Sequence, residues 1–280
     1  MQEIREAINF CEISIPNIQT LSYVNFKKSH SPLKLHTHPN QFEICFHDTG
    51  AQTYIIDGKE YRTNGGDILV SFPNETHSTG SYCEEKSALY YMIFELNQSI
   101  ERFLEFDETE TEYLLQSLLG IKRRQFPASI RIKEILNRVF SVYKSNHPLR
   151  IGKIRALMTE LFCELIDCSG CEKRTVPNDI QRVIHFLNQH PDLNFKLCEL
   201  AEIACLSLPR FKQKFKEITG FPPMEYADRL KIELAKRLLS DNKSTITEIS
   251  YDLGFSSSQH FSSVFKKYTT FTPRQFRKLN

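Results

Sequence analysis

The spacing of apolar residues changes once along this chain of 280 residues, and that change limits its architecture more than any other feature. From about Ile13 to Leu96 the apolar residues form short alternating runs rich in Tyr, Phe, Ile and Val, which is typical of β-strands. After Asn97 they recur at helical spacing, over Thr111–Leu119, Ile130–Tyr143 and Ile151–Ile166. We therefore expect an α+β protein whose strands precede its helices.

Turn signals divide the first part into many short strands. Asp57-Gly58 separates two alternating runs and accepts the positive φ angles of a tight hairpin turn. Asn64-Gly65-Gly66 precedes the apolar run Ile68–Phe72 in the same way. Short strands at this spacing are typical of a barrel or a sandwich, and we expect a β-barrel.

The polar segment Cys168–Asp179 (CSGCEKRTVPND) interrupts the helical pattern and marks a domain boundary. We expect a barrel over 1–97, a helical linker and dimerisation region over 98–175, and a separate helical domain over 176–280. Within the linker region, Ile151–Ile166 is the dimer interface that we expect.

Charge and composition indicate the class of protein. Residues 176–280 contain 16 Lys and Arg against 11 Asp and Glu, whereas residues 1–175 contain 20 against 23. A basic end of this kind favours a polyanionic partner. The first residues, MQEIREAINFCEIS, lack the apolar core of a signal peptide, and no apolar run is long enough to cross a membrane. We expect a cytoplasmic protein with reduced cysteines.

The basic end contains two helix-turn-helix patterns. In Phe195–Gly220 a short helix is followed by a turn at Cys205-Leu206, and Ser207 can cap a second helix that buries Phe211 and Phe215. In Ser244–Pro273 the turn is at Gly254, and Ser256 or Ser257 can cap the second helix. The exposed faces of the two second helices would carry Arg210, Lys212, Ser258, Gln259, His260, Ser262, Ser263, Lys266 and Lys267.

Such side chains suit DNA, because Gln, Ser and His hydrogen-bond base edges while Lys and Arg neutralise phosphates. The helical segment Pro222–Ser240 between the two patterns would be roughly 28 Å long, close to the ~34 Å between successive major grooves on one face of DNA. The alternative is a helical scaffold without a DNA partner, but two tandem units with the same pattern argue against it.

From Asp179 to its end the chain resembles the DNA-binding domain of AraC/XylS-type transcriptional regulators. The resemblance is carried by ELAEIACLSLPRFKQKFKEITGFPPMEYADRLKIELAKRLL and above all by LGFSSSQHFSSVFKK followed by TPRQFR. It implies that the helices from Ser207 and Ser257 enter successive major grooves. The base-facing residues that it implies are Pro209, Lys212, Gln213, Ser258, Gln259, His260, Ser262 and Ser263.

Three positions depart from the family pattern. Cys205 and Thr270 stand where glycine is common, and a non-glycine residue at positive φ costs on the order of 1 kcal/mol, which leaves open a differently built first turn. Pro209 fits the first turn of a helix but offers no hydrogen-bond donor. We therefore expect weaker base readout by the first unit.

The N-terminal part contains a second motif. His36, His38, Glu43 and Gly50 resemble the first cupin motif, and Gly66, Pro73 and His77 resemble the second, with Asn74 in place of the usual glycine. His36 and His38 point to one face of a strand. With Glu43 and His77 they are candidate ligands for Zn, Mn, Fe or Ni.

The two resemblances together imply a regulator rather than an enzyme. They imply a small effector, often a sugar, bound in the barrel, with promoter DNA and RNA polymerase as further partners and a homodimeric activator as the assembly. The effector-contacting residues that we expect are His36, His38, Glu43, Tyr54, His77, Tyr91 and Phe94. The alternative is a metal-binding cupin that senses metal or catalyses a reaction. Cys163, Cys168 and Cys171 also have ligand-like spacing, but we interpret them as ordinary thiols.

Overall fold

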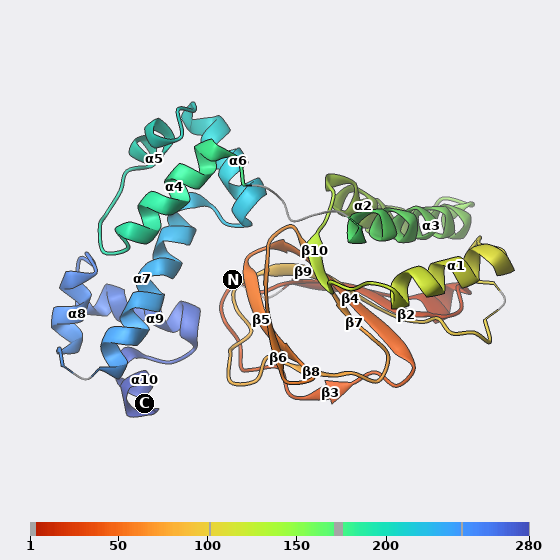
Figure 1. Cartoon of the computed structure of the whole chain (residues 1–280), viewed down its shortest axis with the longest axis horizontal. Coiled ribbons are helices and arrows are strands. Elements are labelled where there is room, and N and C mark those ends of the chain that lie inside the picture. The colour runs from red at the N-terminus through yellow and green to blue at the C-terminus, as the bar shows by residue number, and fades with distance from the viewer. Residues whose placement is uncertain (1–3, 101, 171–175, 242, 280) are drawn as a thin grey trace. The chain divides into compact units, whose positions relative to one another are not determined.

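The computed structural model describes residues 4–100, 102–170, 176–241 and 243–279. They form two compact units (Figure 1), which we describe separately. The first unit consists of residues 1–25, 33–82 and 87–174, and the second of residues 26–32, 83–86 and 175–280. No helix among the described residues is long and apolar enough to span a membrane.

The first unit contains two antiparallel sheets. The larger has the strand order β1 (Ile4–Asn9), β2 (Ile18–Asn25), β9 (Ala88–Glu95), β4 (Gln41–Thr49), β7 (Asp67–Ser71) and β10 (Gln125–Pro127). The smaller has the order β3 (His36–Thr37), β8 (Thr76–Ser78), β5 (Ala51–Ile56) and β6 (Lys59–Asn64). The expected turn joins β5 and β6, with φ angles of 46° at Asp57 and 79° at Gly58. The β-rich expectation is confirmed, but across the described strands the hydrogen bonding forms two sheets rather than one closed barrel.

Three helices cover one face of the larger sheet (Figure 1). They are α1 (Glu108–Leu119), α2 (Ile130–Tyr143) and α3 (Arg150–Ser169), which match the three helical patterns of the sequence. Phe94 of β9 lies 4.9 Å from Phe162 of α3, measured between ring centroids. Strand β10, which lies between α1 and α2, pairs with β7. The helical region therefore shares one core with the strands.

The apolar side of α3 packs into this core. Its buried side chains are Ile154, Leu157, Met158, Leu161, Phe162, Leu165 and Cys168. These residues produced the periodicity that suggested a dimer interface at Ile151–Ile166. Since they pack within their own unit, that periodicity gives no support for a partner surface.

The opposite face of the larger sheet positions the candidate site. On β4 the side chains of Phe42, Ile44 and Phe46 belong to the core beneath the helices. The alternate residues Glu43, Cys45 and His47 point to the other face, because neighbouring side chains in a strand alternate. There Cys45 and Leu69 pack with Tyr54 and Ile56 of the smaller sheet. This region between the two sheets is called the inter-sheet space below.

The described residues of the second unit form seven helices. They are α4 (Asn178–Gln189), α5 (Leu197–Ile203), α6 (Leu208–Thr219), α7 (Pro223–Ser240), α8 (Ile246–Asp252), α9 (Ser258–Thr269) and α10 (Pro273–Leu279). Two separate cores lie along α7. Ala227 packs with α4, α5 and α6, whereas Ile232, Ala235 and Leu239 pack with α8 and α9. Helix α7 thus holds two small helical cores in one unit.

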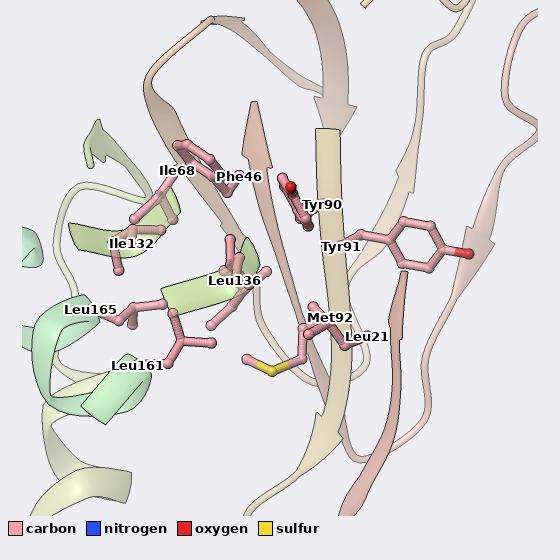
Figure 2. Close-up of a pocket in the computed structure, with 11 residues that line it drawn as sticks. Leu21, Phe46, Ile68, Tyr90, Tyr91, Met92, Ile132, Leu136, Leu161 and Leu165 are labelled. Atoms are coloured by element: carbon pink, nitrogen blue, oxygen red, sulfur yellow. The ribbon is translucent and has the colours of Figure 1, made fainter. Parts of the chain in front are cut away.

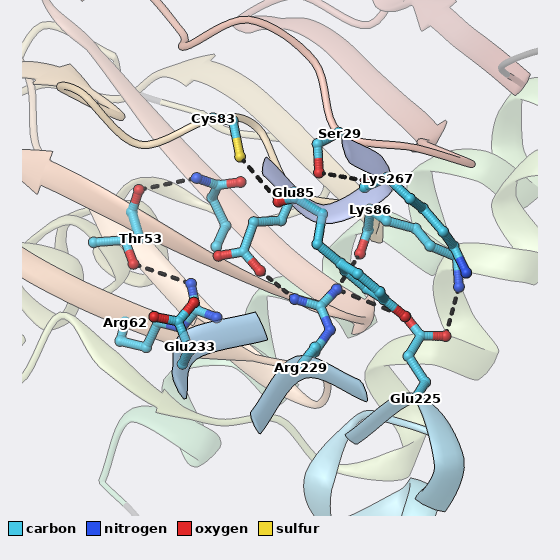
Figure 3. A network of polar contacts seen from close by, with 12 residues as sticks. Ser29, Thr53, Arg62, Cys83, Glu85, Lys86, Glu225, Arg229, Glu233 and Lys267 are labelled. Atoms are coloured by element: carbon cyan, nitrogen blue, oxygen red, sulfur yellow. Dashed lines mark hydrogen bonds and ion pairs between the residues drawn. The ribbon is translucent and has the colours of Figure 1, made fainter. Parts of the chain in front are cut away.

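Two short segments, 26–32 and 83–86, complete the second unit (Figure 3). The Arg229 guanidinium on α7 pairs with the carboxylate of Glu85 and donates to the backbone carbonyl of Lys86 over 2.8 Å. Lys86 in turn pairs with Glu225 over 2.5 Å. The Arg229 guanidinium also stacks on Phe221, 4.3 Å from the ring centroid. This network fixes the segment 83–86 against α7.

Candidate functional site

The turns that precede α6 and α9 have the same backbone hydrogen bonds. The amide of Leu206 donates to the carbonyl of Ala201 over 3.0 Å, and the amide of Phe255 donates to the carbonyl of Ser250 over 2.9 Å. Cys205 adopts a φ of 55° and Gly254 a φ of 72°. This is the helix-ending motif that favours glycine in the left-handed region. The first turn is therefore not built differently, and Cys205 adopts the strained conformation.

The ends of α6 and α9 are also alike. Thr219 donates its hydroxyl to the carbonyl of Phe215 over 2.7 Å, and Thr269 donates to that of Phe265 over 2.8 Å. The next residues, Gly220 and Thr270, have φ angles of 76° and 68°. Two helix-turn-helix units with matching local geometry therefore flank α7.

The expected DNA-contacting residues lie on the outer faces of α6 and α9. The exposed residues among them are Ser207, Pro209, Arg210, Lys212, Gln213, Gln259, His260, Ser263, Lys266 and Lys267, and the half-buried ones are Ser257, Ser258 and Ser262. Ser257 caps α9 by accepting the amide of His260 over 3.1 Å, whereas Ser207 makes no such bond. Lys214, also on α6, pairs with Asp179 over 2.6 Å. The side chains that the sequence assigned to DNA are thus available on the surface of this unit.

His36, His38, Glu43 and His77 meet in the inter-sheet space, and we call them the His–Glu cluster. His36 and His77 are direct partners across β3 and β8, and Glu43 comes from β4 of the larger sheet. The Glu43 Oε2 atom lies 2.6 Å from His77 Nε2 and 3.4 Å from His38 Nε2. One ligand atom of each residue lies within 4.8 Å of all the others. The structure thus brings together residues that are 41 positions apart at most in the sequence.

Charges within the cluster stabilise one another. Burial disfavours the charged form of Glu43, but its contacts with His38 and His77 outweigh this effect and lower the pKa of Glu43 to about 2. Burial also disfavours a charged His77, but the neighbouring carboxylate outweighs it and raises the pKa of His77. The contacts in the cluster therefore favour the ionised carboxylate of Glu43 beside His38 and His77.

Comparison with known proteins assigns separate family models to the N-terminal and C-terminal parts of the chain. The family model of an AraC-like ligand binding domain matches residues 28–162, and that of a helix-turn-helix domain matches residues 200–279. The HTH-type transcriptional activator RhaS from Escherichia coli (strain SE11) is 24% identical over 254 residues, which is 86% of either chain. The chain belongs to the AraC family of transcriptional regulators.

Two solved structures are among those to which this AraC-family chain is similar. ToxT from Vibrio cholerae O395 is 13% identical and covers 98% of this chain and 97% of its own, with a TM-score of 0.36. The C-terminal domain of AraT, a response regulator from Geobacillus stearothermophilus, is 22% identical and covers 38% of this chain and 89% of its own, with a TM-score of 0.37.

This AraC-family protein is thus a DNA-binding transcriptional regulator with a ligand-binding domain, and the His–Glu cluster lies within that domain. Of the other residues that we expected at the effector, Tyr54 and Tyr91 border the inter-sheet space. Phe94 does not, because it points to the opposite face of β9 and packs on Phe42 and Phe162. The expectation of an effector contact at Phe94 is therefore corrected: it is a core residue.

Polar residues that the sequence reading missed extend the same region. His47 is fully buried and its Nε2 atom lies 3.1 Å from the hydroxyl of Tyr54. The thiol of Cys45 lies 3.6 Å from Glu43 Oε1. The signal was present in the sequence, since Glu43, Cys45 and His47 alternate along one strand and must share a face. Gln52 and Thr63 of the smaller sheet are buried as well.

An apolar cavity lies between the larger sheet and the helices α2 and α3 (Figure 2). Its volume is about 20 Å³, which is room for roughly one water molecule. The residues around it are Leu21, Ile44, Phe46, Ile68, Tyr90, Tyr91, Met92, Ile132, Leu136, Leu161 and Leu165. The ring of Tyr91 points away from the others (Figure 2). This cavity is too small for a metabolite.

Proposed function

We propose that this AraC-family protein reads promoter DNA with both α6 and α9, and that a small polar metabolite bound in the inter-sheet space sets its activity. The proposal that both helices read DNA is supported by the matched geometry of the two turns, at Cys205 and Gly254. Each turn is followed by a helix with an exposed polar face. Helix α7 has 18 residues and is therefore roughly 27 Å long. That length suits two readers in successive major grooves, which are ~34 Å apart.

The proposal that a metabolite binds in the inter-sheet space is supported by the polar side chains of that region. Four buried polar side chains, His47, Gln52, Thr63 and His77, lie in this region, and such a concentration is unusual for a core that only packs. Tyr54, Tyr61 and Tyr91 add aromatic surface at the same place. A few directed polar groups beside aromatic rings are typical of small-molecule sites, and a sugar is the class that we propose.

The remaining partners follow from the activity. A transcriptional activator acts on RNA polymerase at the promoter, so we propose the polymerase as a partner and a cytoplasmic location beside the chromosome. We propose that the chain is not an enzyme, in line with relatives that are named as transcriptional activators. The homodimer is proposed from the family resemblance alone, since the apolar side of α3 is covered within its own unit.

Thermal unfolding of the full chain with a panel of monosaccharides, sugar phosphates and hydroxy acids tests the effector site. The informative variant is Tyr54→Phe, which removes the hydroxyl beside His47, and Tyr113→Phe is the matched control on an exposed part of α1. We expect an effector to stabilise the wild type and the control more than Tyr54→Phe. We also expect it to change the affinity for DNA by about 5–150-fold, the usual range of coupling between two sites. Equal stabilisation of all three proteins would contradict binding in the inter-sheet space.

A further inference from the structure

Lys231 is a buried cation in the middle of α7, with 6% of its surface exposed. It lies between Ala227, which packs into the core with α4, α5 and α6, and Ile232, which packs into the core with α8 and α9. Burial lowers the pKa of Lys231, and the nearby carboxylates of Asp228 and Asp192 oppose this effect only in part. Lysine is rarely buried, and an apolar side chain often packs as well in such a place, so the ammonium needs an explanation.

The ammonium of Lys231 is joined to both helix-turn-helix units through one amide group. Lys231 Nζ donates to the Oδ1 atom of Asn194 over 2.6 Å, and Asn194 lies in the loop that leads into α5. The Nδ2 atom of the same amide donates over 2.8 Å to the backbone carbonyl of Gly254, in the turn between α8 and α9. An ammonium only donates and a carbonyl only accepts, so these two partners fix the orientation of the amide. We call these three residues the Lys–Asn–Gly bridge.

The loop before α5 packs closely against the turn at Gly254. A Cβ atom at residue 254 would lie 2.9 Å from Asn194 Nδ2 and 3.1 Å from the backbone carbonyl oxygen of Asp192. Glycine is therefore needed here for close approach as well as for its positive φ of 72°. The ring of the next residue, Phe255, has its centroid 5.6 Å from Lys231 Nζ, close enough to attract the cation. The loop, the turn and α7 thus meet at one place.

Such a bridge restrains motion between the two helix-turn-helix units. Two cores that pack along one helix can slide and tilt slightly against it. The bridge adds a direct connection from the loop before α5 to the turn before α9. We propose that Lys231 and Asn194 are positioning residues, which fix α9 relative to α6 and thereby set the spacing that the protein accepts between two blocks of bases. This inference rests on the proposed function, since it requires that both helices read DNA.

The spacing of the two blocks is what the bridge should control. One base pair added between them moves the second block by about 3.4 Å and rotates it by about 35° around the DNA axis. To follow that change α9 has to move relative to α6, and the Lys–Asn–Gly bridge has to break. The loss of one hydrogen bond to a charged group corresponds to about 10-fold or more in affinity. A protein without the bridge does not incur this part of the loss.

Binding of the full-length protein to duplexes of altered spacing tests the inference. The probes are duplexes that the wild type selects from a random pool, with one base pair added or removed between the two blocks of preferred bases. Fluorescence anisotropy gives the affinity for each duplex. Lys231→Met keeps an unbranched stem and removes the ammonium, whereas Asn194→Ala removes the amide from an exposed loop position. The matched control is Lys236→Met, the same change at a lysine of α7 that pairs with Glu233.

The readout is the ratio of the affinity for the selected spacing to the affinity for the altered spacing. We expect both bridge variants to remain folded by circular dichroism and to lower this ratio by about 10-fold or more relative to the wild type. The double variant, Lys231→Met with Asn194→Ala, should lower it no further than either single change, because both remove the same bridge. Lys236→Met should leave the ratio unchanged. Should Lys231→Met fail to fold, Asn194→Ala alone decides the outcome.

An unchanged ratio in the folded bridge variants would overturn the inference, and so would an equal decrease in the Lys236→Met control. A wild type that binds the two blocks equally well at every spacing would also overturn it, but would leave the proposed function intact. A wild type that selects a single block would contradict the reading of DNA by both α6 and α9, and the inference would fail with it.

Discussion

Cys205 and Gly254 occupy the same position in two copies of one turn. Each follows a short helix, each has a positive φ, and the next residue of each closes the same backbone hydrogen bond to the preceding helix. Only Gly254 is free of the steric penalty of this conformation. The first unit therefore folds into the family's turn despite its sequence, and the two turns should respond to substitution in opposite ways.

Cys205→Gly should stabilise the full chain by about 0.5–1 kcal/mol, since relief of left-handed strain exceeds the extra flexibility of glycine in the unfolded state. Gly254→Ala should destabilise it by more than about 1 kcal/mol from strain alone. A Cβ at residue 254 would also lie 3.1 Å from the carbonyl oxygen of Asp192. Urea denaturation of both variants measures the two changes. Shifts of the same sign would contradict the equivalence of the turns.

Gln259→Ala and Lys266→Ala should weaken DNA binding in different ways. Both side chains are exposed on α9, but an amide reads base edges whereas an ammonium contacts phosphates. We expect Gln259→Ala to cost about 1–3 kcal/mol on the specific site and to leave the salt dependence unchanged. Lys266→Ala should weaken specific and random duplexes alike and reduce the salt slope by about 1. Fluorescence anisotropy at several salt concentrations measures both effects.

Equal losses of affinity for specific and random duplexes in Gln259→Ala would show that Gln259 does not read bases. A suitable control is Glu233→Ala, an exposed change on α7 next to Lys236. We expect it to leave the preference for the specific duplex unchanged.

Arg229→Ala should destabilise the protein markedly. The side chain is only 12% exposed, pairs with Glu85 and stacks on Phe221, so its removal takes the guanidinium away from a largely buried carboxylate. We expect a loss of about 3 kcal/mol, as for other buried pairs from which one member is removed. Lys236→Ala, which breaks an exposed pair on the same helix, should cost less than about 1 kcal/mol. Chemical denaturation compares the two, and equal effects would contradict a structural role for the buried pair.

The sequence predicted the helices better than the arrangement of the strands. Helical periodicity located α1, α2 and α3 because their apolar stripes face a single core. Local turn chemistry located the hairpin at Asp57-Gly58 in the same way. Whether strands close into a barrel depends on hydrogen bonds between distant segments, and the pattern along one strand contains no information about them. The strand pattern therefore could not decide between a closed barrel and two sheets.

The sequence predicted only part of the candidate site. The motif spacing brought His36, His38, Glu43 and His77 together correctly, because short strands fix which side chains share a face. Phe94 was misassigned, since an aromatic residue on a strand buried on both faces gives no sign of the side to which it points. For DNA contacts, the sequence predicted exposure on α6 and α9 but not that Cys205 would adopt the glycine-like turn.

The most direct test of the account is selection of bound duplexes from a random pool by the full-length protein, followed by sequencing. If α6 and α9 both read DNA, the enriched sequences should contain two blocks of preferred bases whose centres are about 10 base pairs apart. Gln259→Ala should relax only one block, and that block should be the more strongly constrained one, since Pro209 gives α6 no donor there. A single block, or no enrichment over the starting pool, would contradict promoter reading by two helix-turn-helix units.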